Sequence, residues 1–220
     1  MLPPVLRLIL DGPQSHATNM AVDEALLSQA LQPVLRAYEW DQKCVSIGYF
    51  SKKAQVPPGV DFVRRSSGGG IVSHGDDFTF SVVFPVAHDF ARTSAEEAYE
   101  GIHDCLRCAL EDVGVKCVLA DCCVKGGTGE CFVGYEKYDV LAGGVKIAGG
   151  AQKRTSKGFL HQGSVHFAGE RRSLALALSK QIARRFSLEI RDSSLTPAEK
   201  SMVQDLEKSR YANPAWNDKF

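Results

Sequence analysis

The hydrophobic and polar positions along the chain recur with two periods, which predict where strands and helices lie. Short β-branched or aromatic runs predict strands at 5–10, 34–40, 44–50, 59–65, 78–86, 115–120 and 159–167. The run at 34–40 alternates and ends in aromatic residues, and the run at 44–50 is predicted to be its neighbour in the sheet. Residues 78–86, FTFSVVFPV, are β-branched and aromatic, which favours a central strand.

Four segments combine an apolar stripe at helical spacing with a helix start signal or a stop signal. They predict helices at about 18–31, 95–113, 173–186 and 197–211. Thr18 or Asn19 is expected to cap the first helix. The letters SAEE at 94–97 and TPAE at 196–199 form capping boxes, and Gly114 is a candidate C-cap.

The order of these elements indicates the fold class. Residues 138–149, YDVLAGGVKIAG, predict a hairpin with Gly143 and Gly144 at its turn. Strands and helices are mixed without strict alternation, which predicts an α+β fold rather than a doubly wound parallel sheet. No repeat, low-complexity segment or break in composition marks a boundary. We therefore expect a single domain over residues 1–220, with C-terminal helices at about 170–212.

Charge and cysteine content narrow the class of protein. Lysine plus arginine equals aspartate plus glutamate, at 26 each, so the chain lacks the charge footprint of bulk nucleic-acid or membrane binding. No apolar run approaches the roughly 20 residues of a membrane span. A secreted disulfide framework would hold its cysteines more densely than these seven, so we expect a reduced, cytosolic protein.

A zinc site is the alternative that four of the thiols allow: Cys105, Cys108, Cys122 and Cys123. Against it, Cys105 falls on the core stripe of its helix.

The segment RRSSGGGIVSH at 64–74 carries the most suggestive chemistry. Its contiguous glycines match neither a Walker loop nor a dinucleotide fingerprint, and Ile71 and Val72 lead into a strand rather than a helix. Strands on both sides argue against a linker. The glycines would let the backbone approach a ligand closely, and Arg64 and Arg65 would add charge for an anion. A glycine-rich bulge with solvated arginines explains the pattern equally well.

Five motifs, in order, resemble those of one enzyme family. They are NMAVDEALL at 19–27, LRAYEWDQKCVSIGYFSK at 35–52, RRSSGGGIVSHGDDFTFSVV at 64–83, GGVKIAGGAQKR at 143–154 and LHQGSV at 160–165. Together they resemble the lipoate–protein ligase A and lipoyl/octanoyltransferase family, whose catalytic domain has the biotin/lipoate protein ligase fold. The resemblance implies a mixed, largely antiparallel sheet flanked by helices, with a tunnel for an octanoyl-length chain.

The resemblance also implies a set of site residues. Substrate-binding residues would be Arg65, Ser67, Gly68, Gly69, Gly70, His74, Gly149 and Ala151. Lys146 would reach the carboxyl or carbonyl end of the acyl group, although its spacing alone favours a solvated hairpin lysine. Cys131, followed by Phe132, matches the cysteine that carries the acyl group in one branch of the family. Tyr135-Glu136 differs from the Pro-Ser of that branch, and by pattern alone Cys131 could be an idle loop cysteine.

Two chemistries are open within the family. A transferase takes an octanoyl or lipoyl group from a thioester, through Cys131, and needs no cofactor. A ligase activates free lipoate with ATP and magnesium as an adenylate, and the residues after the last motif are too few for the accessory domain that family ligases use.

The resemblance implies acceptors as well. They would be lipoyl domains of 2-oxoacid dehydrogenases or the glycine cleavage H protein, with an acyl carrier protein as donor and no nucleic acid or membrane as partner. A non-catalytic module that binds an acyl group or a carrier protein is the remaining alternative, and the intact Lys146 argues against it.

Overall fold

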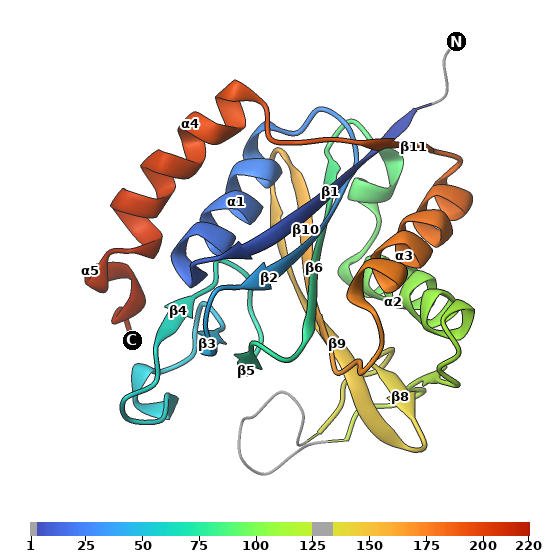
Figure 1. The fold of residues 1–220 in the computed structure, drawn as a ribbon, viewed down its shortest axis with the longest axis horizontal. Helices are drawn as coiled ribbons and strands as arrows, with labels where there is room; N and C mark the ends of the chain where they lie inside the picture. Colours follow the sequence, from blue (N-terminus) through green and yellow to red (C-terminus); the bar gives the residue numbers. More distant parts are fainter. Residues whose placement is uncertain (1–3, 125–133) are drawn as a thin grey trace.

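An eight-stranded mixed sheet forms the centre of the computed structural model, which describes residues 4–124 and 134–220 (Figure 1). Its strand order is β11-β1-β2-β6-β10-β9-β8-β7. The strands are β1 (Val5–Gln14), β2 (Val34–Trp40), β6 (Phe78–Pro85), β7 (Val118–Leu119), β8 (Val140–Ala142), β9 (Val145–Thr155), β10 (Gly158–Val165) and β11 (Glu189–Asp192). From β2 through β6 to β7 the neighbours are antiparallel, whereas β2, β1 and β11 run parallel. The α+β class, the largely antiparallel sheet and the central position of β6 are confirmed.

A second sheet of three strands lies beside the end of β2. It contains β3 (Cys44–Ile47), β4 (Phe62–Arg64) and β5 (Ile71–His74), in the order β4-β3-β5. The prediction that residues 44–50 pair with residues 34–40 is therefore wrong. Both edges of β2 are occupied by β1 and β6, so the following strand starts a sheet of its own.

Helices cover both faces of the large sheet (Figure 1). One face carries α1 (His16–Gln29) and α4 (Pro197–Leu206), and the other carries α2 (Ala95–Asp112) and α3 (Arg171–Phe186). Two apolar clusters of buried side chains correspond to these layers, one beneath α1 and one beneath α2 and α3. Burial of apolar surface on both faces is the main force that holds the sheet between the helices.

Most helix and turn signals act as predicted. The capping boxes of α2 and α4 form, and Pro197 occupies the first turn of α4. Gly143 and Gly144 have φ values of +57° and +80° at the turn between β8 and β9, so the predicted hairpin is confirmed. The first helix begins earlier than predicted, because its N-cap is Ser15 and not Thr18 or Asn19. The Ser15 hydroxyl accepts the capping hydrogen bond from the amide of Thr18.

The C-terminal segment is more divided than its sequence pattern indicates. The α-helix ends at Leu206 and continues as a π-helical turn, Glu207–Tyr211. A further short helix, α5 (Pro214–Asn217), follows it and was not predicted. Strand β11 was not predicted either, because three of its four residues are charged and exposed, and the segment gains its strand geometry by pairing with β1.

Candidate functional site

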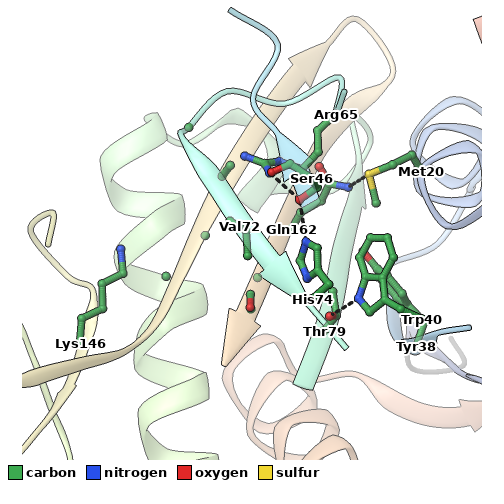
Figure 2. Close-up of a pocket in the computed structure, with 16 residues that line it drawn as sticks. Met20, Tyr38, Trp40, Ser46, Arg65, Val72, His74, Thr79, Lys146 and Gln162 are labelled. Atoms are coloured by element: carbon green, nitrogen blue, oxygen red, sulfur yellow. Dashed lines mark hydrogen bonds between the residues drawn. The ribbon is translucent and has the colours of Figure 1, made fainter. Parts of the chain in front are cut away.

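A pocket lies between the two sheets and α1 (Figure 2). Met20 of α1 and Trp40 of β2 form an apolar end, and Lys146 of β9 lies at the opposite end. Six of the residues predicted to bind substrate or act in catalysis line it: Arg65, Gly69, His74, Lys146, Gly149 and Ala151. The structure therefore brings together the glycine segment, the β9 motif and the predicted lysine.

The other three predicted substrate-binding residues, Ser67, Gly68 and Gly70, lie just behind this lining or beside it. Ser67 is buried, and its hydroxyl donates to Oε1 of Gln162 at 2.6 Å. The carbonyl of Gly70 accepts a hydrogen bond from Nη2 of Arg65 at 3.0 Å. Gly68 lines a shallower groove on the α2 side, which shares Gly69 with the pocket.

The glycine loop, residues 67–70, packs directly against the segment that follows β3. The amides of Gly48 and Tyr49 donate to the carbonyls of Gly70 and Ser67, at 3.2 and 2.8 Å. A Cβ atom at Gly48 would lie 1.9 Å from the carbonyl oxygen of Gly69, so only glycine fits there. Gly69 itself has φ +87°, which favours glycine. The loop is thus a packed wall of the pocket and not a flexible linker.

Arg64 has a structural role that its sequence pattern does not reveal. The side chain is completely buried, and its guanidinium donates to five backbone carbonyls. These belong to Gly48, Tyr49, Ser51, Trp216 and Asn217. Arg64 therefore ties the segment after β3 to α5. Its positive charge, which was expected to bind an anion, is directed into the protein.

Arg65 holds the glycine loop from the other side. Its guanidinium donates to the carbonyl and hydroxyl oxygens of Ser46, at 2.9 and 2.6 Å. It also donates to the carbonyls of Gly68 and Gly70, at 3.0 Å each. Arg65 thus fixes the loop while its side chain lines the pocket.

His74 stacks on Trp40, with the ring centroids 4.1 Å apart. Its Nδ1 lies 2.8 Å from Oδ2 of Asp77 and its Nε2 lies 2.6 Å from Oγ of Ser46. Burial lowers the pKa of His74, so the ring is neutral at pH 7. Because a carboxylate only accepts, Nδ1 carries the proton and Nε2 accepts from the Ser46 hydroxyl. Burial opposes ionisation of Asp77, but hydrogen bonds from His74, Ser164 and Thr79 hold its pKa below the usual range.

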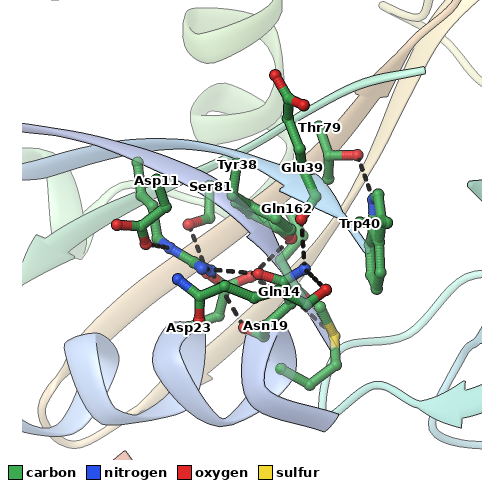
Figure 3. A network of polar contacts seen from close by, with 12 residues as sticks. Asp11, Gln14, Asn19, Asp23, Tyr38, Glu39, Trp40, Thr79, Ser81 and Gln162 are labelled. Atoms are coloured by element: carbon green, nitrogen blue, oxygen red, sulfur yellow. Dashed lines mark hydrogen bonds and ion pairs between the residues drawn. The ribbon is translucent and has the colours of Figure 1, made fainter. Parts of the chain in front are cut away.

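A buried polar network supports the pocket from the α1 side (Figure 3). Asp23 accepts hydrogen bonds from four side chains on three strands: Arg36, Tyr38, Ser81 and Gln162. Burial disfavours the charged form of Arg36, yet the carboxylates of Asp23 and Asp11 raise its pKa and keep it protonated. Burial and Asp23 together raise the pKa of Tyr38 well above its ordinary value, so its hydroxyl remains a donor.

Gln162 is a polar residue of the pocket lining that the sequence did not single out. It lines the pocket and joins Ser67 of the glycine loop to Asp23 of α1. His161, its neighbour in the LHQGSV motif, is buried against Tyr99 and His103 of α2. Side chains alternate between the faces of a strand, so only one of the two could face the pocket. That alternation was the available signal.

Lys146 forms an ion pair at the end of the pocket. Its Nζ lies 2.8 Å from Oδ2 of Asp139, whose side chain is fully buried. Lys146 itself is 9% exposed, which is unlike the solvated hairpin lysine that its position in the sequence allowed. A Cβ at Gly149 would lie 2.6 Å from Cε of Lys146, so the glycine leaves the space that the lysine side chain occupies.

Cys131 lies outside the described residues. Among the cysteines within them, Cys105 is buried in the core beneath α2, as its stripe predicts, whereas Cys122 and Cys123 are exposed. In the described part of the chain, no three histidine, cysteine or acidic side chains are grouped so that they could hold a metal ion.

None of the helices in residues 4–124 and 134–220 has both the length and the apolar character needed to cross a membrane.

Sequence comparison identifies relatives with named activities. An octanoyltransferase LipM from Brevibacillus brevis is 29% identical, and the alignment covers 96% of this chain and 98% of the relative. An octanoyltransferase LipM from Oceanobacillus iheyensis is 34% identical over 70% of this chain and 60% of the relative. The chain thus spans nearly all of the first relative and less than two thirds of the second.

Solved structures share the fold. A candidate lipoate protein ligase from T. acidophilum superposes with a TM-score of 0.84 and 21% identity, covering 98% of this chain and 99% of the other. A lipoate-protein ligase A with bound ATP gives a TM-score of 0.82 with 22% identity, covering 97% and 98%. A bi-partite lipoate protein ligase from Thermoplasma acidophilum, studied with its E2 lipoyl domain, gives 0.78 with 21% identity, covering 99% and 97%.

Residues 15–205, which include α1, the glycine loop, β9, β10 and most of α4, match the model of the lipoyl protein ligase A/B catalytic domain. The pocket, the motifs that form it and the fold of its structural neighbours agree with that match. This chain belongs to the lipoyl protein ligase A/B catalytic-domain family.

Proposed function

We propose that this enzyme transfers an octanoyl or lipoyl group from a thioester donor to a lysine of a lipoyl domain. The observation that carries the proposal is the pocket itself, which pairs an apolar end at Met20 and Trp40 with the Lys146 ammonium at the other end. Burial against this apolar end would favour binding of an eight-carbon acyl chain. The ammonium would lie near the carbonyl, where negative charge develops during acyl transfer.

Cys131 is the nucleophile in this proposal. The Cys131 thiol gives up its proton and its sulfur attacks the donor carbonyl. A new carbon–sulfur bond forms, the bond between the carbonyl carbon and the donor sulfur breaks, and the donor sulfur takes up that proton and leaves as a thiol. The amine of the acceptor lysine then attacks the acyl-enzyme. An amide forms, the bond to Cys131 breaks, and the sulfur of Cys131 takes up the proton that the amine loses, which restores the thiol. Lys146 polarises the carbonyl in both steps, and neither step needs a cofactor, because the thioester is already activated.

An ATP-dependent lipoate ligase is the second candidate, and a structural neighbour with bound ATP keeps it open. It would need magnesium and positive charge for the triphosphate. In this chain the guanidinium of Arg64 is directed at backbone carbonyls, and Arg65 holds the glycine loop. This engagement of both arginines, together with relatives named octanoyltransferases, favours the transferase.

The acceptor in the proposal is a lipoyl domain, the kind of partner named with one structural neighbour. Domains of 2-oxoacid dehydrogenases and the glycine cleavage H protein are the acceptors to test, and an acyl carrier protein is the donor to test. The proposed reaction requires Cys131 as a free thiol. This requirement fits an enzyme that acts in the reducing cytoplasm.

One experiment separates the two chemistries. The purified protein is given an apo lipoyl domain with either octanoyl-acyl carrier protein or lipoate and Mg-ATP, and the product is measured by intact mass. The transferase predicts product with the carrier alone and an acylated enzyme that Cys131→Ala abolishes. Cys123→Ala, which removes an exposed thiol, should leave both unchanged. Product only with ATP would establish the ligase instead.

The proposed role of Lys146 has its own test. Lys146→Ala should lower the rate of transfer by about 100-fold or more, as loss of one oxyanion-stabilising group does in other enzymes. Lys157→Ala removes an exposed lysine at the turn between β9 and β10 and should leave the rate unchanged. A Lys146→Ala enzyme with the wild-type rate would refute the site.

A further inference from the structure

Two side chains of α2, one turn apart, reach across to the segment that holds the Lys146 ion pair. Tyr99 and His103 are four residues apart and therefore lie on the same face of the helix. Their rings are in contact, with centroids 4.0 Å apart. Neither lines the pocket itself, although Tyr99 borders the neighbouring groove on the α2 side, so their contacts with this segment require a different explanation.

Tyr99 connects the partner of Lys146 to the wall of the pocket. Its hydroxyl donates to Oδ1 of Asp139 at 2.6 Å and accepts from the amide of Gly150 at 3.0 Å. The other carboxylate oxygen of Asp139 accepts from Lys146 and from the amide of Glu136, both at 2.8 Å. Both oxygens of Asp139 are thereby fixed, and with them the direction from which the carboxylate meets Lys146.

His103 fixes the backbone that carries Asp139. The ring is fully buried, and burial lowers its pKa to about 4, so it is neutral at pH 7. Its Nδ1 lies 2.7 Å from the carbonyl of Tyr138 and must be the donor, because a carbonyl only accepts. Tyr138 has φ +71°, a conformation that non-glycine residues seldom adopt. The hydrogen bond from His103 helps to hold that strained turn, which places Asp139 beneath Lys146.

We infer that Tyr99 and His103 are positioning residues, which orient Asp139 so that it holds the Lys146 ammonium at the carbonyl end of the acyl pocket. The inference rests on the proposed role of Lys146 in acyl transfer. A lysine has four rotatable side-chain bonds, and a charge that stabilises a transition state must be held in place before the reaction. Helix α2 thus acts on the reaction through the 136–139 turn without contacting the substrate.

The test measures kcat and KM of transfer for variants of these two residues. Tyr99→Phe keeps the ring and removes the hydroxyl, and we expect kcat to fall about 10- to 100-fold while KM for the acyl donor changes little. His103→Leu should act in the same direction. His103→Asn, whose amide can donate from nearly the position of Nδ1, should recover most of the lost rate. Arg107→Gln alters an exposed ion pair on the same helix and serves as the control.

A double-mutant comparison separates positioning from general destabilisation. If Tyr99 acts through Asp139, then Tyr99→Phe should not lower kcat further in an Asp139→Asn background. All rates are taken below the thermal midpoint of each variant. Wild-type kcat in Tyr99→Phe and His103→Leu, in an enzyme that Lys146→Ala inactivates, would overturn the inference and leave the proposed function intact. An active Lys146→Ala enzyme would instead refute the proposed function.

Discussion

Single glycines decide whether the walls of the pocket can approach one another. Gly48 is the sharpest case, because a Cβ there would meet the carbonyl oxygens of Gly69 and Gly68 at 1.9 and 2.9 Å. Both are backbone atoms, which cannot rotate away as a flexible side chain can. The segment after β3 would have to separate from the glycine loop, and the wall of the pocket would move with it.

We therefore predict that Gly48→Ala lowers the free energy of unfolding by about 1–3 kcal/mol and reduces acyl transfer more than ten-fold. Gly12→Ala is the matched control, since a Cβ at Gly12 meets no atom within 4 Å. Denaturant unfolding and the transfer assay measure the two effects. Equal stability and activity in both variants would mean that the glycine loop is not packed as described.

For single residues, the sequence predicts which of them share the pocket but not which hydrogen bonds each of them makes. The glycine loop, His74, Lys146 and Gly149 share one pocket, as the motifs implied. The hydrogen bonds of Arg64 could not be predicted, because most of its acceptors are carbonyls of α5 and of the segment after β3, which only the tertiary fold brings to it.

Helix α1 is joined to the strands beneath it by charge as well as by apolar packing. Arg36 of β2 is completely buried, and its guanidinium donates to the side chains of Asp23 and Asn19 on α1 and of Asp11 on β1 (Figure 3). Removal of the arginine alone would leave the carboxylate of Asp23 buried without its cation. A buried charge that has lost its partner is far more costly than an exposed pair.

Arg36→Met should therefore lower the free energy of unfolding by about 3–5 kcal/mol. Arg191→Met removes an arginine that pairs with Glu189 at the exposed edge of the sheet, and its effect should stay below about 1 kcal/mol. Urea unfolding of the two variants beside the wild type makes the comparison. Similar losses in both would show that the Arg36 network contributes no more than a surface ion pair.

Some elements are determined by local sequence signals, and others depend on tertiary contacts. The capping boxes, the Gly143-Gly144 turn and the apolar stripe of α2 are local signals, and they act as predicted. Strand β11 and the separate three-stranded sheet depend on which edges the other strands leave open, and no local pattern encodes that. Periodicity thus predicted the elements that carry the site better than it predicted their pairing.

Across the whole molecule, three buried histidines make stability depend on pH. Burial lowers the pKa of His103 to about 4, that of His161 well below its ordinary value, and that of His74 as well. In the unfolded chain each titrates near pH 6.5. As the pH falls below about 6.5, the unfolded state takes up protons that the folded state does not, so stability falls.

The loss of stability caused by the histidines occurs in a different pH range from the loss of stability caused by the carboxylates. Asp77, Glu24 and Glu199 also have lowered pKa values, because hydrogen bonds and cations outweigh the effect of burial. For them the stabilisation is present above the unfolded pKa, about 4, and is lost only below it. A decline that begins near pH 6.5 and is well advanced at pH 5 would therefore come from the histidines.

We predict that the free energy of unfolding falls between pH 7 and pH 5, with each of the three histidines contributing up to about 1.4 kcal/mol per pH unit. His161 is the best residue for a test, since neither of its ring nitrogens has a hydrogen-bond partner among the described residues. His161→Leu removes a titrating group and keeps an apolar side chain, so the slope of stability against pH between pH 7 and pH 5 should decrease. Urea unfolding at pH 7, 6 and 5 measures that slope. An unchanged slope in His161→Leu would mean that this ring takes up its proton in the folded protein as readily as in the unfolded chain.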